Sequence, residues 1–277
     1  MNIELQGVVG HHPSAKARAS PAVRGVSLSI APGEQVAVIG PSGAGKTTLL
    51  HLMACALKPT GGTVRLADRD LWALSRTALQ ALRGNLFLAP QVPPLPPRQR
   101  VVIAVLAGRL PHESLWVSLR SLFYPTDIAL ADRALDRFDL SDKLFDRVDR
   151  LSGGERQRVG LARALASQAS LFLVDEPLSA LDPTRSRQAI ETLTSVARER
   201  GATLVATLHH VEMALAHFPR IVGLRGGELA FDLPAAQVTQ QHLLDLYAQH
   251  LNELTGPAEA DLVPEAPTPT PVVMHCR

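Results

Sequence analysis

The sequence has few cysteines and few aromatic residues, and it has no apolar run long enough to cross a membrane. Only two of its 277 residues are cysteine, Cys55 and Cys276. Two isolated thiols argue against a structural disulfide and a thiolate metal site. Apolar stretches such as Val101–Ala107 fall far short of the ~20 residues that span a bilayer, and the N-terminus lacks the pattern of a signal peptide. We therefore expect a cytoplasmic protein.

The chain also lacks a strong charge of either sign. It has 28 Lys and Arg against 26 Asp and Glu, a formal net charge of +2, and its arginines are scattered without a long basic run. No nucleic-acid partner is expected from this pattern. Hydrophobic residues make up 46% of the chain, which is enough for a substantial core in one large domain or two intimate subdomains.

A glycine-rich octapeptide is the most informative feature that is present. It matches the phosphate-binding pattern Gly-x4-Gly-Lys-[Ser/Thr] at every fixed position. Its residues are Gly40, Pro41, Ser42, Gly43, Ala44, Gly45, Lys46 and Thr47. An apolar strand pattern at 35–39 precedes it, and a helical pattern begins at Thr48. The sequence therefore predicts a nucleoside triphosphate site over residues 40–48, with a ligand-free glycine turn as the structural alternative.

Each part of this loop has a chemical task in such a site. The glycines bring backbone N–H groups onto the phosphate oxygens, at a helix N-terminus whose dipole favours anions. Lys46 adds a positive charge, and Thr47 offers a hydroxyl to Mg²⁺. The loop alone is compatible with kinases, GTPases, helicases and transport ATPases.

A second apolar strand pattern, at residues 171–174, ends in two carboxylates, Asp175 and Glu176. The first is placed to hold Mg²⁺ through water, and the second to orient or deprotonate the attacking water. A strand that ends in an ordinary acidic turn is the structural alternative.

A second glycine-containing helix start follows the pattern Leu-Ser-Gly-Gly-Glu at residues 151–155, before a predicted helix. Ser152 can cap that helix, and Gly153 and Gly154 permit close backbone approach. One nucleotide does not readily need two phosphate-binding helix starts from one subunit. A helix cap that merely contains two glycines is the alternative. With the preceding motifs, this segment resembles the signature of ATP-binding cassette (ABC) ATPases.

The resemblance covers roughly residues 3–251 and implies ATP hydrolysis coupled to transmembrane transport. It implies a head-to-tail dimer in which each ATP lies between the phosphate loop of one subunit and the signature of the other, including Glu155. By resemblance, Gln91 reports on Mg²⁺ and water, and His209 contacts the γ-phosphate. Asp182 ends a loop at the dimer interface, although residues 179–182 also fit a capped helix start.

Two positions depart from the family pattern. Where the family stacks an aromatic residue on adenine, the alignment gives His12, so base stacking is expected to be weak. The proline-rich segment 92–97 after Gln91 is unlike the usual sequence and is expected to alter docking to a permease. His210, beside the switch histidine, is expected to be exposed to solvent.

The order of the elements predicts the architecture. Strand patterns occur at residues 3–6, 26–30, 35–39, 63–66, 171–174 and 203–207. Four prolines exclude helix and central strand from 92–97, and helical patterns dominate residues 101–150. We expect an α/β P-loop NTPase (RecA-like) core with an N-terminal antiparallel β subdomain and a helical subdomain inserted at about 92–165. This ABC ATPase domain spans 1–251, and a disordered Pro-rich tail spans 252–277.

Local strings at residues 104–110, 115–123, 208–214 and 221–228 resemble the phosphonate/phosphite importer group. That resemblance implies a peripheral protein at the cytoplasmic face of the inner membrane, bound to a separate integral-membrane permease and served indirectly by a periplasmic or surface solute-binding protein. Trp116, Leu119 and Phe123 share helical spacing and fit either core or permease contacts. The alternatives are a soluble non-transport cassette ATPase, a subunit for export or another substrate, and a paralogue that only binds nucleotide.

Overall fold

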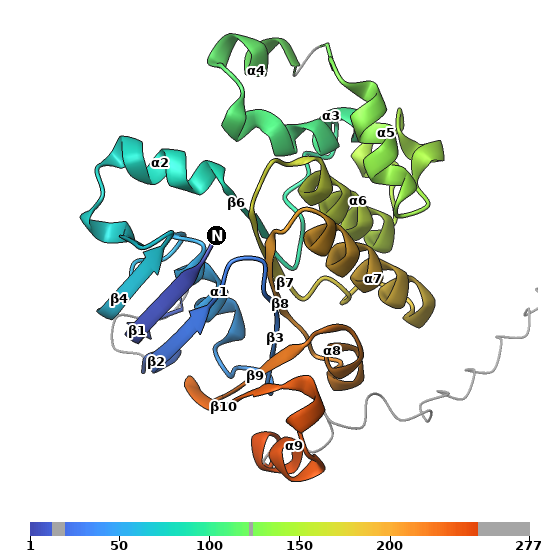
Figure 1. Ribbon diagram of the computed structural model, residues 1–277. Helices are drawn as coiled ribbons and strands as arrows, with labels where there is room; N and C mark the ends of the chain where they lie inside the picture. Colours follow the sequence, from blue (N-terminus) through green and yellow to red (C-terminus); the bar gives the residue numbers. More distant parts are fainter. Residues whose placement is uncertain (13–19, 122–123, 249–277) are drawn as a thin grey trace, which may run out of the picture.

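Two β-sheets form the framework of the computed structural model, which describes residues 1–12, 20–121 and 124–248 (Figure 1). The smaller sheet is antiparallel, with the strand order β2 (Val23–Ile30), β1 (Ile3–Gly10), β4 (Gly61–Leu66) and β5 (Arg69–Asp70). The larger sheet has the order β10 (Glu228–Pro234), β9 (Arg220–Arg225), β3 (Gln35–Ile39), β8 (Thr203–Thr207), β7 (Leu171–Asp175) and β6 (Leu86–Ala89). In this sheet β10 runs antiparallel to β9, and the other pairs are parallel.

The larger sheet separates two hydrophobic cores. Its strands β3, β7 and β8 are buried along their whole length, as expected for parallel strands covered on both faces. Side chains alternate between the faces of a strand. Ala37 and Ile39 therefore belong to the core that includes residues of the helices at 101–106, 128–136, 153–166 and 183–199. Val36 and Val38 belong to the other core, which includes residues of the smaller sheet and of the helix after the glycine-rich loop.

Helices surround this framework and form a separate group at the top of Figure 1. The α-helices of the described residues are α1 (Lys46–Met53), α2 (Arg76–Gly84), α3 (Val101–Leu106), α4 (Leu115–Ser121), α5 (Ile128–Asp136), α6 (Gly153–Ala166), α7 (Pro183–Glu199), α8 (Val211–His217) and α9 (Gln240–Leu246). Short 3-10 helices lie at Leu71–Ala73, Ala107–His112, Ser141–Lys143, Val148–Arg150 and Ala235–Gln237. Helices α3 to α6 stand between β6 and β7 in the chain, and α6 packs against α3 and α5.

The predicted fold class is confirmed, since the α/β core, the antiparallel N-terminal sheet and the inserted helices are all present. All six predicted strands occur. Four observed strands, β5, β6, β9 and β10, were not predicted from the sequence. The predicted tail at 252–277, Cys276 and Phe123 lie outside the described residues.

The helix α4 resolves one open alternative. None of its residues is buried, and Leu115, Trp116 and Leu119 are 83%, 81% and 51% exposed. Trp116 and Leu119 are therefore not core residues of this chain. Among the described residues, no helix combines the length and the apolarity needed to cross a bilayer.

Candidate active site

The phosphate loop joins β3 to α1, and its conformation requires glycine at two positions. Gly40 and Gly45 have φ angles of 152° and 100°, where L side chains are strained. A Cβ atom at Gly40 would lie 2.0 Å from the carbonyl oxygen of Leu224, and one at Gly45 would lie 2.2 Å from that of Ala22. The pattern that predicted the loop therefore also fits its packing.

The loop opens into a cavity of about 350 Å³ that fits a nucleotide's phosphates. Its lining residues are His12, Ala22, Ser42, Gly43, Ala44, Gly45, Lys46, Thr47, Thr48, Glu176 and His209. No side chain caps the N-terminus of α1, so its first N–H groups suit an anionic ligand. The Lys46 Nζ atom donates hydrogen bonds to the carbonyl oxygens of Gly40 (2.7 Å) and Pro41 (3.2 Å), which holds this cation over the loop.

The two predicted carboxylates follow each other at the end of β7. Asp175 is 3% exposed, and its Oδ1 atom accepts a 2.6 Å hydrogen bond from the Thr207 hydroxyl. Glu176 has a φ of 46°, in the left-handed region that non-glycine residues rarely adopt. Such backbone conformations are concentrated at functional sites, where the surrounding structure holds them.

The Glu176 carboxylate brings together both other predicted catalytic residues. His209 Nε2 lies 2.6 Å from Oε1, and the Gln91 side-chain amide donates a 2.7 Å hydrogen bond to Oε2. The hydrogen bond from His209 lowers the pKa of Glu176, aided by the charges of His209 and Lys46 and opposed by burial. This carboxylate is therefore held in the ionised form that a general base requires. His210 is exposed, as predicted.

The signature segment lies apart from this cavity. Ser152 caps α6 in a capping box, in which Glu155 N–H donates to the Ser152 hydroxyl (3.2 Å) and Ser152 N–H donates to the Glu155 carboxylate (2.7 Å). Gly154 packs closely, since a Cβ atom there would lie 2.9 Å from Ala180 O, whereas Gly153 has no atom within 4 Å of that position. None of residues 152–155 lines the phosphate-loop cavity.

Asp182 is also outside the cavity. It is exposed and caps α7, where its Oδ1 atom accepts a 3.0 Å hydrogen bond from Arg185 N–H. The capped helix start, one of the two alternatives for residues 179–182, is therefore present. The role of Asp182 at a dimer interface stays a prediction.

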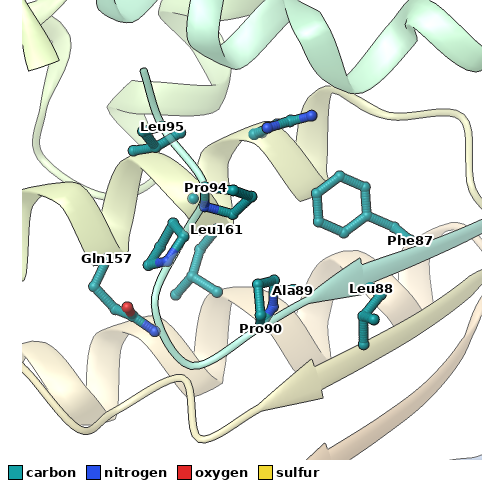
Figure 2. A pocket seen from close by; sticks show the side chains of 11 residues that line it. Phe87, Leu88, Ala89, Pro90, Pro94, Leu95, Gln157 and Leu161 are labelled. Carbon is teal, nitrogen blue, oxygen red and sulfur yellow. The ribbon is translucent and has the colours of Figure 1, made fainter. Parts of the chain in front are cut away.

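The proline-rich segment after Gln91 packs on α6 (Figure 2). Pro93, Pro94 and Leu95 help to line a small cavity of about 80 Å³ with Phe87 and Leu161. Pro93 lies against Gly160, where an added Cβ atom would be 2.6 Å from Pro93 Cγ. The proline-rich segment thus connects Gln91, which contacts Glu176, to α6, the helix that begins at the signature.

Comparison with known proteins supports the family resemblance of the sequence. Residues 23–179 match the ABC transporter family. The chain belongs to the ABC transporter ATPase family. It is 76% identical to the phosphonates import ATP-binding protein PhnC 2 of Albidiferax ferrireducens and 73% identical to the PhnC protein of a Polaromonas species, in both cases over the whole of both chains.

Solved structures of ABC proteins are also similar to this ABC ATPase. One is an ATP-binding cassette solved as a dimer in a post-hydrolysis state with ADP and phosphate. It is 27% identical to this chain with a TM-score of 0.71, and the match covers 84% of this chain and 98% of that one. Another is a bacterial Atm1-family exporter with ATP bound, at 26% identity and a TM-score of 0.72, covering 90% of this chain and 41% of that one. The predicted recognition, fold and ATPase activity are confirmed by these matches.

The sequence analysis missed Ala22, which lines the cavity, and Thr207, which contacts both carboxylate residues. Thr207 lies two positions before His209 and belongs to none of the recognised motifs. A threonine at the end of a buried strand was the only available signal, and it points to no particular chemistry.

Proposed function

We propose that this ABC ATPase energises the import of phosphonates, phosphite or a related phosphorus compound through a separate permease, at the cytoplasmic face of the inner membrane. The observation that carries the proposal is the 73–76% identity, over complete chains, to two proteins that both bear the name phosphonates import ATP-binding protein.

The proposed roles at the active site follow from the chemistry of the side chains. Lys46 and the amides of residues 42–48 bind the ATP phosphates, and Thr47, Asp175 and Gln91 hold Mg²⁺ directly or through water. When bound, Mg²⁺ neutralises charge that develops on the transferred phosphoryl group. Asp175 precedes Glu176, Gln91 is hydrogen-bonded to it, and Glu176 lines the cavity of the phosphate loop. The side-chain oxygens of Thr47, Asp175 and Gln91 suit this ion, which prefers oxygen ligands and retains several waters.

Glu176 is the proposed general base. In the described arrangement both of its oxygens have a partner, His209 on Oε1 and Gln91 on Oε2. A water can reach the carboxylate once one of these partners turns to the nucleotide. His209, which also lines the cavity, is the partner proposed to contact the γ-phosphate. Its transfer from Glu176 to the phosphate would free Oε1 to accept a proton from the attacking water.

A second copy of the chain is the proposed source of the missing half of the site. The start of α6 consists of Ser152, Gly153, Gly154 and Glu155, of which the first two are exposed. None of these residues lines the cavity of its own subunit. A head-to-tail dimer would place this segment, and Asp182 beside the interface, against the partner's phosphate loop. His12, which lines the cavity, is the proposed contact for adenine.

The exposed side of α4 is the proposed contact with the permease. Leu115, Trp116 and Leu119 are a large apolar group on a helix with no buried residue, and such groups mark interaction sites. The solute-binding protein would act on the other side of the membrane, through the permease.

A growth experiment tests this function. A strain without the gene is supplied with methylphosphonate as its only phosphorus source, and it is complemented with the wild-type gene, Glu176→Gln or the exposed control Glu212→Gln. The wild type and Glu212→Gln should restore growth and uptake of labelled methylphosphonate, whereas Glu176→Gln should not, and all strains should grow on phosphate. If deletion leaves phosphonate uptake unchanged, the substrate assignment is wrong.

A further inference from the structure

A buried hydroxyl joins the two carboxylate residues of the site to the strand that precedes His209. Thr207 ends β8, is fully buried, and faces Asp175 in the parallel pairing of β7 with β8. Its Oγ1 atom donates a 2.6 Å hydrogen bond to Asp175 Oδ1 and accepts a 2.9 Å hydrogen bond from the backbone N–H of Glu176. The Thr207 hydroxyl therefore contacts both Asp175 and Glu176, as a hydrogen-bond donor to the first and as an acceptor from the second.

The direction of the two bonds is set by the chemistry of the groups. A threonine hydroxyl has one hydrogen to donate, a carboxylate can only accept, and a backbone N–H can only donate. The hydroxyl hydrogen therefore goes to Asp175, which fixes the rotation of a carboxylate that is almost completely buried. Valine has nearly the same shape but would leave both an acceptor and a donor without this partner.

The backbone of Glu176 needs such a partner. Its φ of 46° is unfavourable for a residue with a side chain, and conformations of this kind persist where neighbouring groups hold them. Thr207 holds the N–H group of Glu176, while His209, two residues further along, contacts the Glu176 side chain. Thr207 at the end of β8 thus contacts the backbone of Glu176, and His209 just after this strand contacts its carboxylate.

We propose that Thr207 is a positioning residue for ATP hydrolysis, which orients the Asp175 carboxylate toward Mg²⁺ and keeps Glu176 in the conformation that presents its carboxylate to His209 and water. Thr207 acts through these two residues and not on the nucleotide. The inference rests on the metal role proposed for Asp175 and the base role proposed for Glu176.

The test compares Thr207→Val with the wild-type full chain. Equilibrium binding of a fluorescent ATP analogue is measured without and with Mg²⁺, and ATPase activity is measured as a function of Mg²⁺ concentration. Binding without Mg²⁺ should stay close to that of wild type, because the groups that contact the phosphates are unchanged. The Mg²⁺ concentration for half-maximal effect should rise about tenfold, because losing a group that orients a metal ligand typically costs 10–100-fold. Thr207→Ser should restore most of the Mg²⁺ response.

Thr203 supplies a matched control on the same strand. It is also fully buried, and its Oγ1 atom donates to the Met1 carbonyl oxygen (2.7 Å) and accepts from Gly33 N–H (3.0 Å). Thr203→Val removes a comparable pair of partly buried hydrogen bonds away from the carboxylates, and a third from the N-terminal ammonium group of Met1 (3.3 Å). Both valine variants should lower the melting temperature, and Thr207→Val alone should change the Mg²⁺ response. An unchanged response in Thr207→Val, or an equal change in both variants, overturns the inference.

Asp175→Asn separates this inference from the proposed function. If Asp175→Asn loses the Mg²⁺ response and Thr207→Val keeps it, the metal role stands and the role of Thr207 is wrong. If Asp175→Asn responds to Mg²⁺ like the wild type, the metal role of Asp175 is wrong, and the inference for Thr207 fails with it.

Discussion

His209 and Glu176 lie 33 positions apart in the chain and meet at 2.6 Å, between Nε2 and Oε1. This contact is the main reason that the pKa of Glu176 lies below the ordinary carboxyl range, and burial works against it. Because this pKa is lower in the folded protein than in the unfolded chain, the ionised Glu176 carboxylate stabilises the fold at pH values above its pKa in the unfolded chain. This stabilisation is lost as the pH falls through the pKa of Glu176 in the folded protein.

His209→Ala should therefore raise the pKa of Glu176. The acid limb of the profile of kcat/KM against pH should move to higher pH, in addition to any loss of rate from a missing phosphate contact. The measurement is the ATPase rate across the acid range, with His210→Ala as the exposed control. An acid limb at the wild-type position would show that His209 does not set the ionisation of the base.

Glu176→Gln should trap an ATP-bound dimer. Glutamine keeps the shape of the side chain but cannot accept a proton, while the phosphate loop and the signature stay intact. Size-exclusion chromatography with MgATP should show a dimer, and hydrolysis should fall by about 10²-fold or more, the lower range for a lost general base. Lys46→Ala should stay monomeric because it loses its phosphate-binding cation. Wild-type turnover by Glu176→Gln would show that Glu176 is not the base.

A mixture of two inactive variants should regain one active site. Gly153→Asp suits this test because no atom lies within 4 Å of its Cβ position, so the new carboxylate should leave the subunit's own packing intact and act on phosphates bound by the partner. Mixed dimers of Lys46→Ala with Gly153→Asp keep one composite site whose loop and signature are both intact. ATP hydrolysis, measured as phosphate release, should return in the mixture alone, because neither variant by itself has a site with both the loop and the signature intact. Activity in each subunit without dimerisation would contradict a site shared between subunits.

Gly160→Ala should weaken the attachment of the proline-rich segment to α6. In a helix alanine is favoured over glycine by about 1 kcal/mol. The added Cβ atom would lie 2.6 Å from Pro93 Cγ, and a rigid proline ring cannot yield as a flexible side chain does. Overpacking of this kind costs about 1–3 kcal/mol, so the net effect should be destabilising. The melting temperature should fall in Gly160→Ala and not in Gly153→Ala, which has open space.

Base selectivity should be weak, because His12 offers less area to adenine than tyrosine does. GTP should be hydrolysed within about tenfold of ATP, or about 1.4 kcal/mol, since the phosphates supply most of the binding. His12→Tyr should lower the KM for ATP and leave kcat nearly unchanged, as expected for uniform binding. Strong preference for ATP in the wild type would show that another residue contacts the base.

The sequence by itself determined the parts of this protein that depend on neighbouring residues. The phosphate loop, the strand that ends in Asp175 and Glu176, and the capped helix at Ser152 are continuous patterns, so their local conformation follows from turn, strand and capping preferences. The same patterns together identified the family. They were sufficient for six of the ten strands of the described residues, and they contain most of the residues that line the phosphate-loop cavity.

Only the tertiary structure decided which side chains meet. Gln91 and Glu176 are 85 positions apart, and they touch because β6 and β7 are parallel neighbours whose ends lie at one edge of the sheet. Thr207 joins the site for the same reason, through the register of β8 against β7. The exposure of Trp116 was open as well, because helical spacing shows that residues share a face but not what covers it. The strands β7 and β8 are buried on both faces, so their continuous apolar sequences do not specify which residues lie opposite each other.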